Sequence, residues 1–167
     1  MGTLAQQLVH PDQPFLIQEL TRAYADEWFA HYNYCFVANT VGGPGSPAVI
    51  PLLRQKARRA LAHANRLAAR IRELGGQPVA KLEALIQHAS DKPFKLPDSM
   101  RDLDGVLKAV LDAERTSMRT YRGLYEHTRE RDPVTQALAL ELLIEAIKGE
   151  EQIERLLGEP APDMDGR

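Results

Sequence analysis

Four long stretches of helical periodicity constrain the fold of this chain more than any other feature. Each stretch repeats apolar side chains at spacings of three and four residues, which is typical of a helix that buries one face. We expect the helices to span approximately residues 12–41, 47–74, 102–129 and 132–157. With no comparable strand pattern between them, the chain is predicted to be all-α.

Helix-breaking residues separate these stretches. Asp12 is a candidate N-cap for the first helix, and the Gly- and Pro-rich block 42–47 ends it. Gly75-Gly76 provides a C-terminal stop for the second helix, and Asp132-Pro133 is an N-cap followed by a first-turn proline for the fourth. A shorter amphipathic piece, residues 80–89, lies between the second and third helices.

The lengths of the connections predict the topology. Short links between the first two helices and between the last two favour two antiparallel hairpins. Residues 75–101 are long enough to cross the full length of a bundle between the hairpins. We therefore expect a four-helix bundle of two hairpins joined by a long crossover, with residues 1–167 forming one domain.

Composition excludes several classes of protein. The formal net charge of −2 gives no basic excess for nucleic acid or an anionic membrane. No apolar run reaches the ~18 residues of a membrane span, and the first residues do not resemble a signal peptide. Cys35 is the one cysteine, so no intrachain disulfide can form. We expect a cytoplasmic protein with neither nucleic acid nor membrane as a partner.

Two predicted core seams each contain a glutamate followed by a tyrosine seven residues later. Glu27 and Tyr34 lie on the first helix, and Glu114 and Tyr121 lie on the third. A buried carboxylate is costly unless it is compensated, so the matched pairs indicate one shared polar site at mid-bundle. On the second helix, His63 lies beside the seam, near the same level.

The sequence resembles the ferritin-like superfamily, in particular the bacterioferritins and the Dps-like mini-ferritins. The resemblance covers all four helices and is carried by the segments AYADEWFAHYNY, HANRLAARIRELGG, VLDAERTSMRTY and LELLIEAIKGEEQIERLLG. It implies a ferritin-like four-helix bundle that binds iron, oxidises it as a ferroxidase, and stores it or protects against oxidative stress. It also implies a homo-oligomer, such as a closed cage.

The resemblance assigns roles to individual positions. In the family, two helices each give one glutamate and the other two each give a Glu-x-x-His motif. Glu27, Glu114 and His63 match metal ligands, while Tyr34 and Tyr121 match tyrosines that hydrogen-bond to ligand carboxylates. The remaining three ligand positions carry small residues, namely Ala60, Ala146 and Gly149. The site is therefore expected to be degenerate as a ferroxidase and to bind at most one iron or other divalent metal.

A second interpretation remains open from the sequence. The small residues would leave space at mid-bundle, and a non-catalytic or engineered scaffold could use that space for a haem-type cofactor bound through His63. Glu145 and Glu150 lie next to the missing ligand positions but about 100° round the helix from them, so neither is expected to join the site. The basic residues Arg54, Lys56, Arg58 and Arg59 are predicted to form a solvated face or subunit contact.

Overall fold

The structure, a computed structural model, describes residues 13–90 and 94–158, so the predicted cap Asp12 lies outside the described part. Within these residues the regular structure is entirely helical. The helices are α2 (Gln13–Thr40), α3 (Ser46–Glu73), α4 (Leu82–His88), α5 (Leu103–Thr128) and α6 (Pro133–Leu157). In the described residues, no helix is long and apolar enough to cross a membrane.

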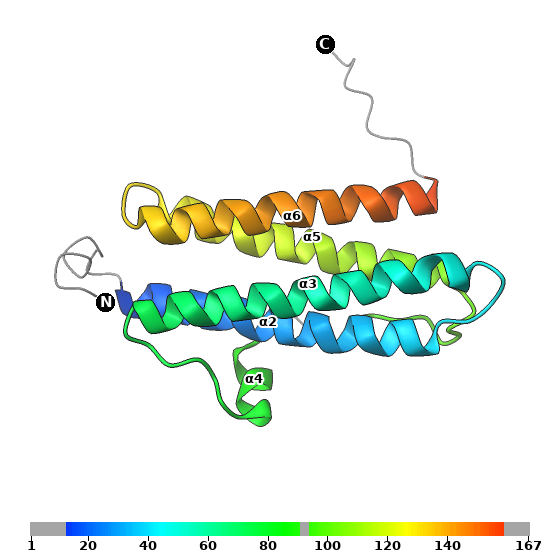
Figure 1. The fold of residues 1–167 in the computed structure, drawn as a ribbon, viewed down its shortest axis with the longest axis horizontal. Coiled ribbons are helices and arrows are strands. Elements are labelled where there is room, and N and C mark those ends of the chain that lie inside the picture. The colour runs from blue at the N-terminus through cyan, green and yellow to red at the C-terminus, as the bar shows by residue number, and fades with distance from the viewer. Residues whose placement is uncertain (1–12, 91–93, 159–167) are drawn as a thin grey trace, which may run out of the picture.

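The four long helices form two antiparallel hairpins that lie against one another (Figure 1). Helices α2 and α3 pack together as one hairpin, and α5 and α6 pack together as the other. The long segment after α3 carries the short helix α4, which packs on α2, and returns along the bundle to the start of α5. The predicted all-α bundle of two hairpins with a crossover is confirmed.

The ends of α6 show how local sequence sets the helix boundaries. The Asp132 side chain accepts hydrogen bonds from the backbone N–H groups of Val134 and Thr135, which the helix leaves without partners of its own. The same carboxylate receives two bonds from the Arg70 guanidinium, at 3.0 and 2.8 Å, so the cap also ties α6 to α3. At the other end, Gly158 adopts a left-handed conformation with φ 72°, which favours glycine.

The apolar core is divided into two clusters along the bundle axis. One cluster contains Leu20, Leu67 and Leu142, and the other contains Val37, Leu53 and Val110. Buried polar and charged side chains occur between these apolar regions, including Glu27, Lys56, His63 and Glu114. This charged layer is where the sequence places its candidate site.

Candidate functional site

The bundle brings Glu27, His63 and Glu114 to its centre. Glu27 comes from α2, His63 from α3 and Glu114 from α5, and all three are buried. Together they line one small internal cavity, into which Tyr34 and Tyr121 also project. The matched Glu–Tyr spacing on two helices therefore does place its members around a shared space.

Both oxygens of the Glu114 carboxylate are held by cations of the same chain. Lys56 donates to Oε1 at 2.7 Å, and Arg59 Nη2 lies 2.8 Å from each carboxylate oxygen. The Tyr34 hydroxyl donates to Oε1 at 2.8 Å. Lys56 also donates to the carbonyl of Gly149 at 3.2 Å, and Arg59 donates to the carbonyl of Glu145 at 3.1 Å.

Of the four basic residues of α3 predicted to form a solvated face or subunit contact, two reach inward instead. Arg54 and Arg58 are exposed, as expected. The side chain of Lys56, in contrast, is only 1% exposed and that of Arg59 is 23% exposed, because both reach inward to Glu114. Burial lowers the pKa of the Lys56 ammonium, as does the nearby Arg59 charge, whereas Glu114 acts in the opposite direction.

His63 lies between two carboxylates, one at each ring nitrogen. Its Nδ1 is 3.2 Å from Glu27 Oε1, and its Nε2 is 2.9 Å from Glu145 Oε2. The expectation that Glu145 stays out of the site is therefore wrong, because its side chain reaches back from α6 to the imidazole. Glu150 does stay out, and binds Arg115 at 2.7 Å.

The surroundings of His63 favour its protonated form. Burial by itself lowers the pKa of the imidazole, but the hydrogen bonds and charges of Glu27 and Glu145 outweigh burial and raise it above the ordinary value of 6.5. A neutral imidazole has one N–H, whereas an imidazolium donates from both nitrogens and satisfies both carboxylates. The pKa of Glu145 is lowered, since contact with His63 and the nearby Arg59 and Arg66 charges outweighs the effect of its burial.

This arrangement predicts a pH dependence of stability. Because the pKa of His63 is raised in the folded state, its imidazolium contributes stability that is fully present below pH 6.5 and is lost as the pH rises through the folded-state pKa. We expect His63→Gln to lower the melting temperature most in mildly acidic buffer and progressively less as the pH rises. Thermal melts of both proteins across this range measure the effect, and a difference that does not change with pH would contradict it.

The two tyrosines cross between the hairpins. Tyr34 on α2 donates to Glu114 on α5, and Tyr121 on α5 donates to Glu27 on α2. Burial raises the pKa of both phenols well above the usual value, as do the charges of Glu114 at Tyr34 and of Glu27 at Tyr121. Both hydroxyls therefore remain protonated and act as hydrogen-bond donors.

Small residues provide the room for the buried cations. Ala60 and Ala146 line the central cavity, and Gly149 is buried beside it. A Cβ atom on Gly149 would lie 2.7 Å from Arg59 Nη2 and 2.7 Å from Glu114 Cδ, with Glu114 Oε2 closer still. The space expected to be empty is occupied by the Lys56 and Arg59 side chains. The central cavity has a volume of about 10 Å³, which leaves no room for a haem.

The donor set, as arranged, does not fit a bound metal. The two carboxylates on His63 lie at opposite nitrogens and do not converge on one point, and both Glu114 oxygens face cations. Among residues 13–90 and 94–158, no group of three or more His, Cys, Asp or Glu side chains is placed to hold a metal ion. The metal site at Glu27, His63 and Glu114 stays a prediction.

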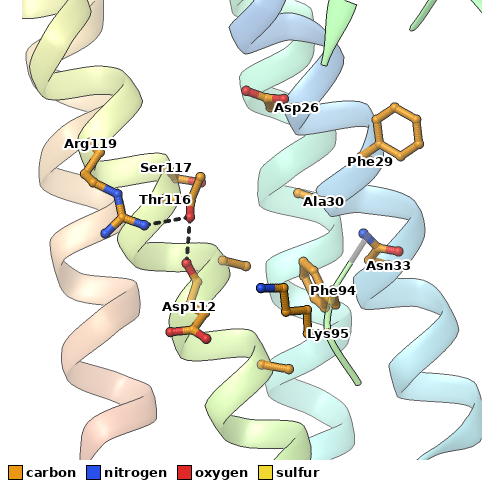
Figure 2. Close-up of a pocket in the computed structure, with 12 residues that line it drawn as sticks. Asp26, Phe29, Ala30, Asn33, Phe94, Lys95, Asp112, Thr116, Ser117 and Arg119 are labelled. Atoms are coloured by element: carbon orange, nitrogen blue, oxygen red, sulfur yellow. Dashed lines mark hydrogen bonds between the residues drawn. The ribbon is translucent and has the colours of Figure 1, made fainter. Parts of the chain in front are cut away.

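A groove of about 380 Å³ runs between α2 and α5 beside the centre (Figure 2). Asp26 and Phe29 line it from α2, and Asp112 lines it from α5. Ala30 and Ser117 line both this groove and the central cavity. The small side chains of Ala30 and Ser117 therefore separate the groove from the charged layer at this level.

Comparison with known proteins agrees with this architecture. A sequence model described as a ferritin-like domain matches residues 17–161. The chain belongs to the ferritin-like family. A curated relative is the DNA protection during starvation protein of Pyrococcus furiosus, which is 31% identical over 147 residues, covering 87% of this chain and 79% of that protein.

Solved structures share the fold of this ferritin-like chain. The dodecameric thioferritin of Bacteroides fragilis, a bacterioferritin-related protein, has a TM-score of 0.83 at 25% identity and covers 93% of this chain and 90% of its own. Dps from Thermosynechococcus elongatus has a TM-score of 0.80 at 18% identity and covers 99% of this chain and 100% of its own. At that identity the second similarity shows the fold alone.

Sequence reasoning missed Lys56, Arg59 and Glu145 as members of the centre. A signal for Lys56 was present, since Leu53, Lys56, Ala60, His63 and Leu67 follow one another at alternating spacings of three and four. This is a heptad seam, and Lys56 occupies a core position of it. No comparable pattern marks Arg59 or Glu145, whose side chains reach the centre from beside the seam.

Proposed function

We propose that this chain is the subunit of a homo-oligomeric ferritin-like protein that handles iron or protects against oxidative stress without an iron-oxidising centre inside its own bundle. Iron would be cargo of the assembly and would not reside at mid-bundle. This differs from the ferroxidase that the resemblance implies, because the carboxylates of the degenerate site are paired with positively charged side chains of the protein.

One observation carries the proposal: protein cations hold both oxygens of Glu114. A ferroxidase centre needs carboxylates free to bridge and neutralise metal ions. Here Lys56 and Arg59 neutralise that carboxylate, and His63 pairs with Glu27 and Glu145. Two irons would have to enter a region where, with His63 protonated, three carboxylates already pair with three positively charged side chains.

Relatives and surface chemistry support the assembly part of the proposal. The related Bacteroides fragilis protein is a dodecamer, and the Pyrococcus furiosus relative is named for DNA protection during starvation. On this chain, Leu82 and Ile86 of α4 and Tyr32 of α2 are exposed large side chains, 75%, 68% and 67% accessible. Contacts between copies would cover such apolar surface. The cytoplasmic location, and the absence of nucleic-acid and membrane partners, stay predictions.

The test is aerobic oxidation of ferrous iron by the purified, chelator-washed protein. We expect the ferric absorbance to rise no faster than in buffer containing a heat-denatured sample, and to show no fast phase that saturates at one or two irons per chain. A ferritin with all six ligands is the positive control. Mass photometry of the same sample should show a single species larger than the monomer.

Two results would overturn the proposal. A fast phase that saturates at a fixed iron-to-chain ratio and disappears in Glu114→Gln would show that the centre oxidises iron. A strictly monomeric protein at micromolar concentration would remove the assembly. The predicted mononuclear metal site would gain support from stoichiometric metal in the purified wild-type protein, measured by elemental analysis.

A further inference from the structure

We propose that Lys56 and Arg59 are the chain's own substitute for a metal ion, and that removing their charges opens a divalent-cation site at Glu114. The inference rests on the proposed function in one respect, namely that the wild-type centre holds no metal. It goes further by naming the groups that exclude the metal and the residues that would bind it in their absence.

The balance of charges at mid-bundle supports this proposal. Glu27, Glu114 and Glu145 bring three negative charges to the centre, and Glu27 and Glu114 are buried. Buried carboxylates need compensation by cations or metals. Lys56 and Arg59 provide two positive charges beside Glu114. Neutralising both side chains removes two positive charges, which one divalent cation restores.

The surroundings of the Lys56 ammonium are the second argument. Lys56 Nζ lies 2.7 Å from a carboxylate oxygen of α5 and 3.2 Å from a backbone carbonyl of α6. Arg59 likewise lies between the Glu114 carboxylate and the Glu145 carbonyl. Carboxylate and carbonyl oxygens are donors that also suit divalent metal ions. The two cations therefore occupy a place that is already surrounded by metal-type donors.

The space around Lys56 and Arg59 and the nearby groove also suit a bound ion. The cavity of about 10 Å³ is too small for an added ion with ligands of its own. Shortening Lys56 and Arg59 empties the volume that Gly149, Ala60 and Ala146 leave around them. The groove between α2 and α5 shares Ala30 and Ser117 with the cavity, so at this level small side chains separate the groove from the centre (Figure 2).

The experiment compares the wild type with Lys56→Met/Arg59→Gln in the full chain. Both are chelator-treated, mixed with Co²⁺, desalted and assayed for metal, and their melting temperatures are measured with and without Co²⁺ or Zn²⁺. We expect about one Co²⁺ per chain in the double variant, with visible absorption bands of bound Co²⁺, and at least a tenfold smaller amount in the wild type. Metal should raise the melting temperature of the double variant and not that of the wild type.

Two controls locate the effect. Arg115→Gln removes a partly exposed cation that also pairs with two glutamates, Glu150 at 2.7 Å and Glu154 at 2.9 Å, and it should bind no Co²⁺. Adding Glu114→Gln to the double variant should abolish metal uptake. Lys56→Met alone, which keeps Arg59, should bind more weakly than the double variant.

The outcomes separate this inference from the proposed function. A folded double variant without bound metal overturns the inference while leaving the proposed function intact. A wild type that binds as much Co²⁺ as the double variant overturns the inference, whereas the proposed function fails on a saturable phase of iron oxidation or on a monomeric state. If the double variant folds only when refolded with Co²⁺ or Zn²⁺, the inference is supported; if it fails to fold even then, and Lys56→Met folds without taking up metal, the inference is wrong.

Discussion

Replacing Glu114 by Gln is expected to destabilise the folded chain by about 3 kcal/mol at neutral pH. Removing one partner of a buried ion pair leaves the other charge uncompensated, which typically costs 3–5 kcal/mol. Here Lys56 and Arg59 both lose their counter-ion, and the Tyr34 hydroxyl loses a charged acceptor. Urea unfolding followed by circular dichroism measures the change.

The matched control is Glu150→Gln, which removes a carboxylate from a more exposed pair with Arg115. Solvent screens that pair, so its loss should cost at most ~1 kcal/mol. A buried carboxylate with no partner would instead be stabilised by conversion to an amide, so the sign of the change reports whether Lys56 and Arg59 compensate Glu114. A Glu114→Gln protein as stable as the wild type would show that the buried ion pairs of Glu114 do not stabilise the fold.

Gly149→Ala is expected to destabilise the chain by about 2–3 kcal/mol, against the intrinsic preference of the helix. Alanine in a helix interior is normally better than glycine by 0.5–1 kcal/mol. At this position, however, the added Cβ would overlap the Glu114 carboxylate and lie 2.7 Å from Arg59 Nη2. Overpacking in a core typically costs 1–3 kcal/mol, and here it also separates an ion pair.

Gly123→Ala provides the opposite case within the same bundle. Gly123 lies in α5, is exposed, and would have no heavy atom within 4 Å of an added Cβ. This variant should gain roughly 0.5–1 kcal/mol from helix propensity alone. Chemical denaturation of the two variants should therefore give shifts of opposite sign. If both substitutions stabilise the protein equally, the Arg59–Glu114 pair does not lie against Gly149.

The same overlap bears on the residue that the family pattern places at position 149. A histidine there would need far more room than a Cβ, and that room is taken by Arg59 and Glu114. We therefore expect that restoring glutamate at Ala60 and Ala146 and histidine at Gly149 rebuilds a di-metal centre only when Lys56 and Arg59 are replaced at the same time.

The fold was predictable because long amphipathic helices can be recognised in a sequence from the repeated spacing of apolar residues and from their capping residues. Asp132 and Gly158 mark the ends of α6 in the sequence and do so in the structure. The pairing of the helices followed from loop length, which is also a local property. Nothing in these features depended on the identity of the residues at mid-bundle.

The contents of the site were harder to predict, because they depend on how far long side chains reach. Glu27, Glu114 and His63 were identified by their positions among apolar residues. Lys56 occupies a core position of the same seam, but four basic residues within six positions of α3 suggested a solvated face. Lysine and arginine have long flexible stems, so a helical wheel does not determine where their charges lie. The Glu145 side chain is also flexible, and it reaches the imidazole of His63 from beside the seam.

The charged layer that divides the core also fixes how the two hairpins align. Lys56 and Arg59 join α3 to α5, His63 joins α3 to α6, and the two tyrosines join α2 to α5 in opposite directions. Apolar seams tolerate sliding, because one leucine layer can replace another, whereas a shift of one heptad here would bury unpaired charges in hydrocarbon. The buried ion pairs and hydrogen bonds at mid-bundle thus favour a single register between the helices of the two hairpins.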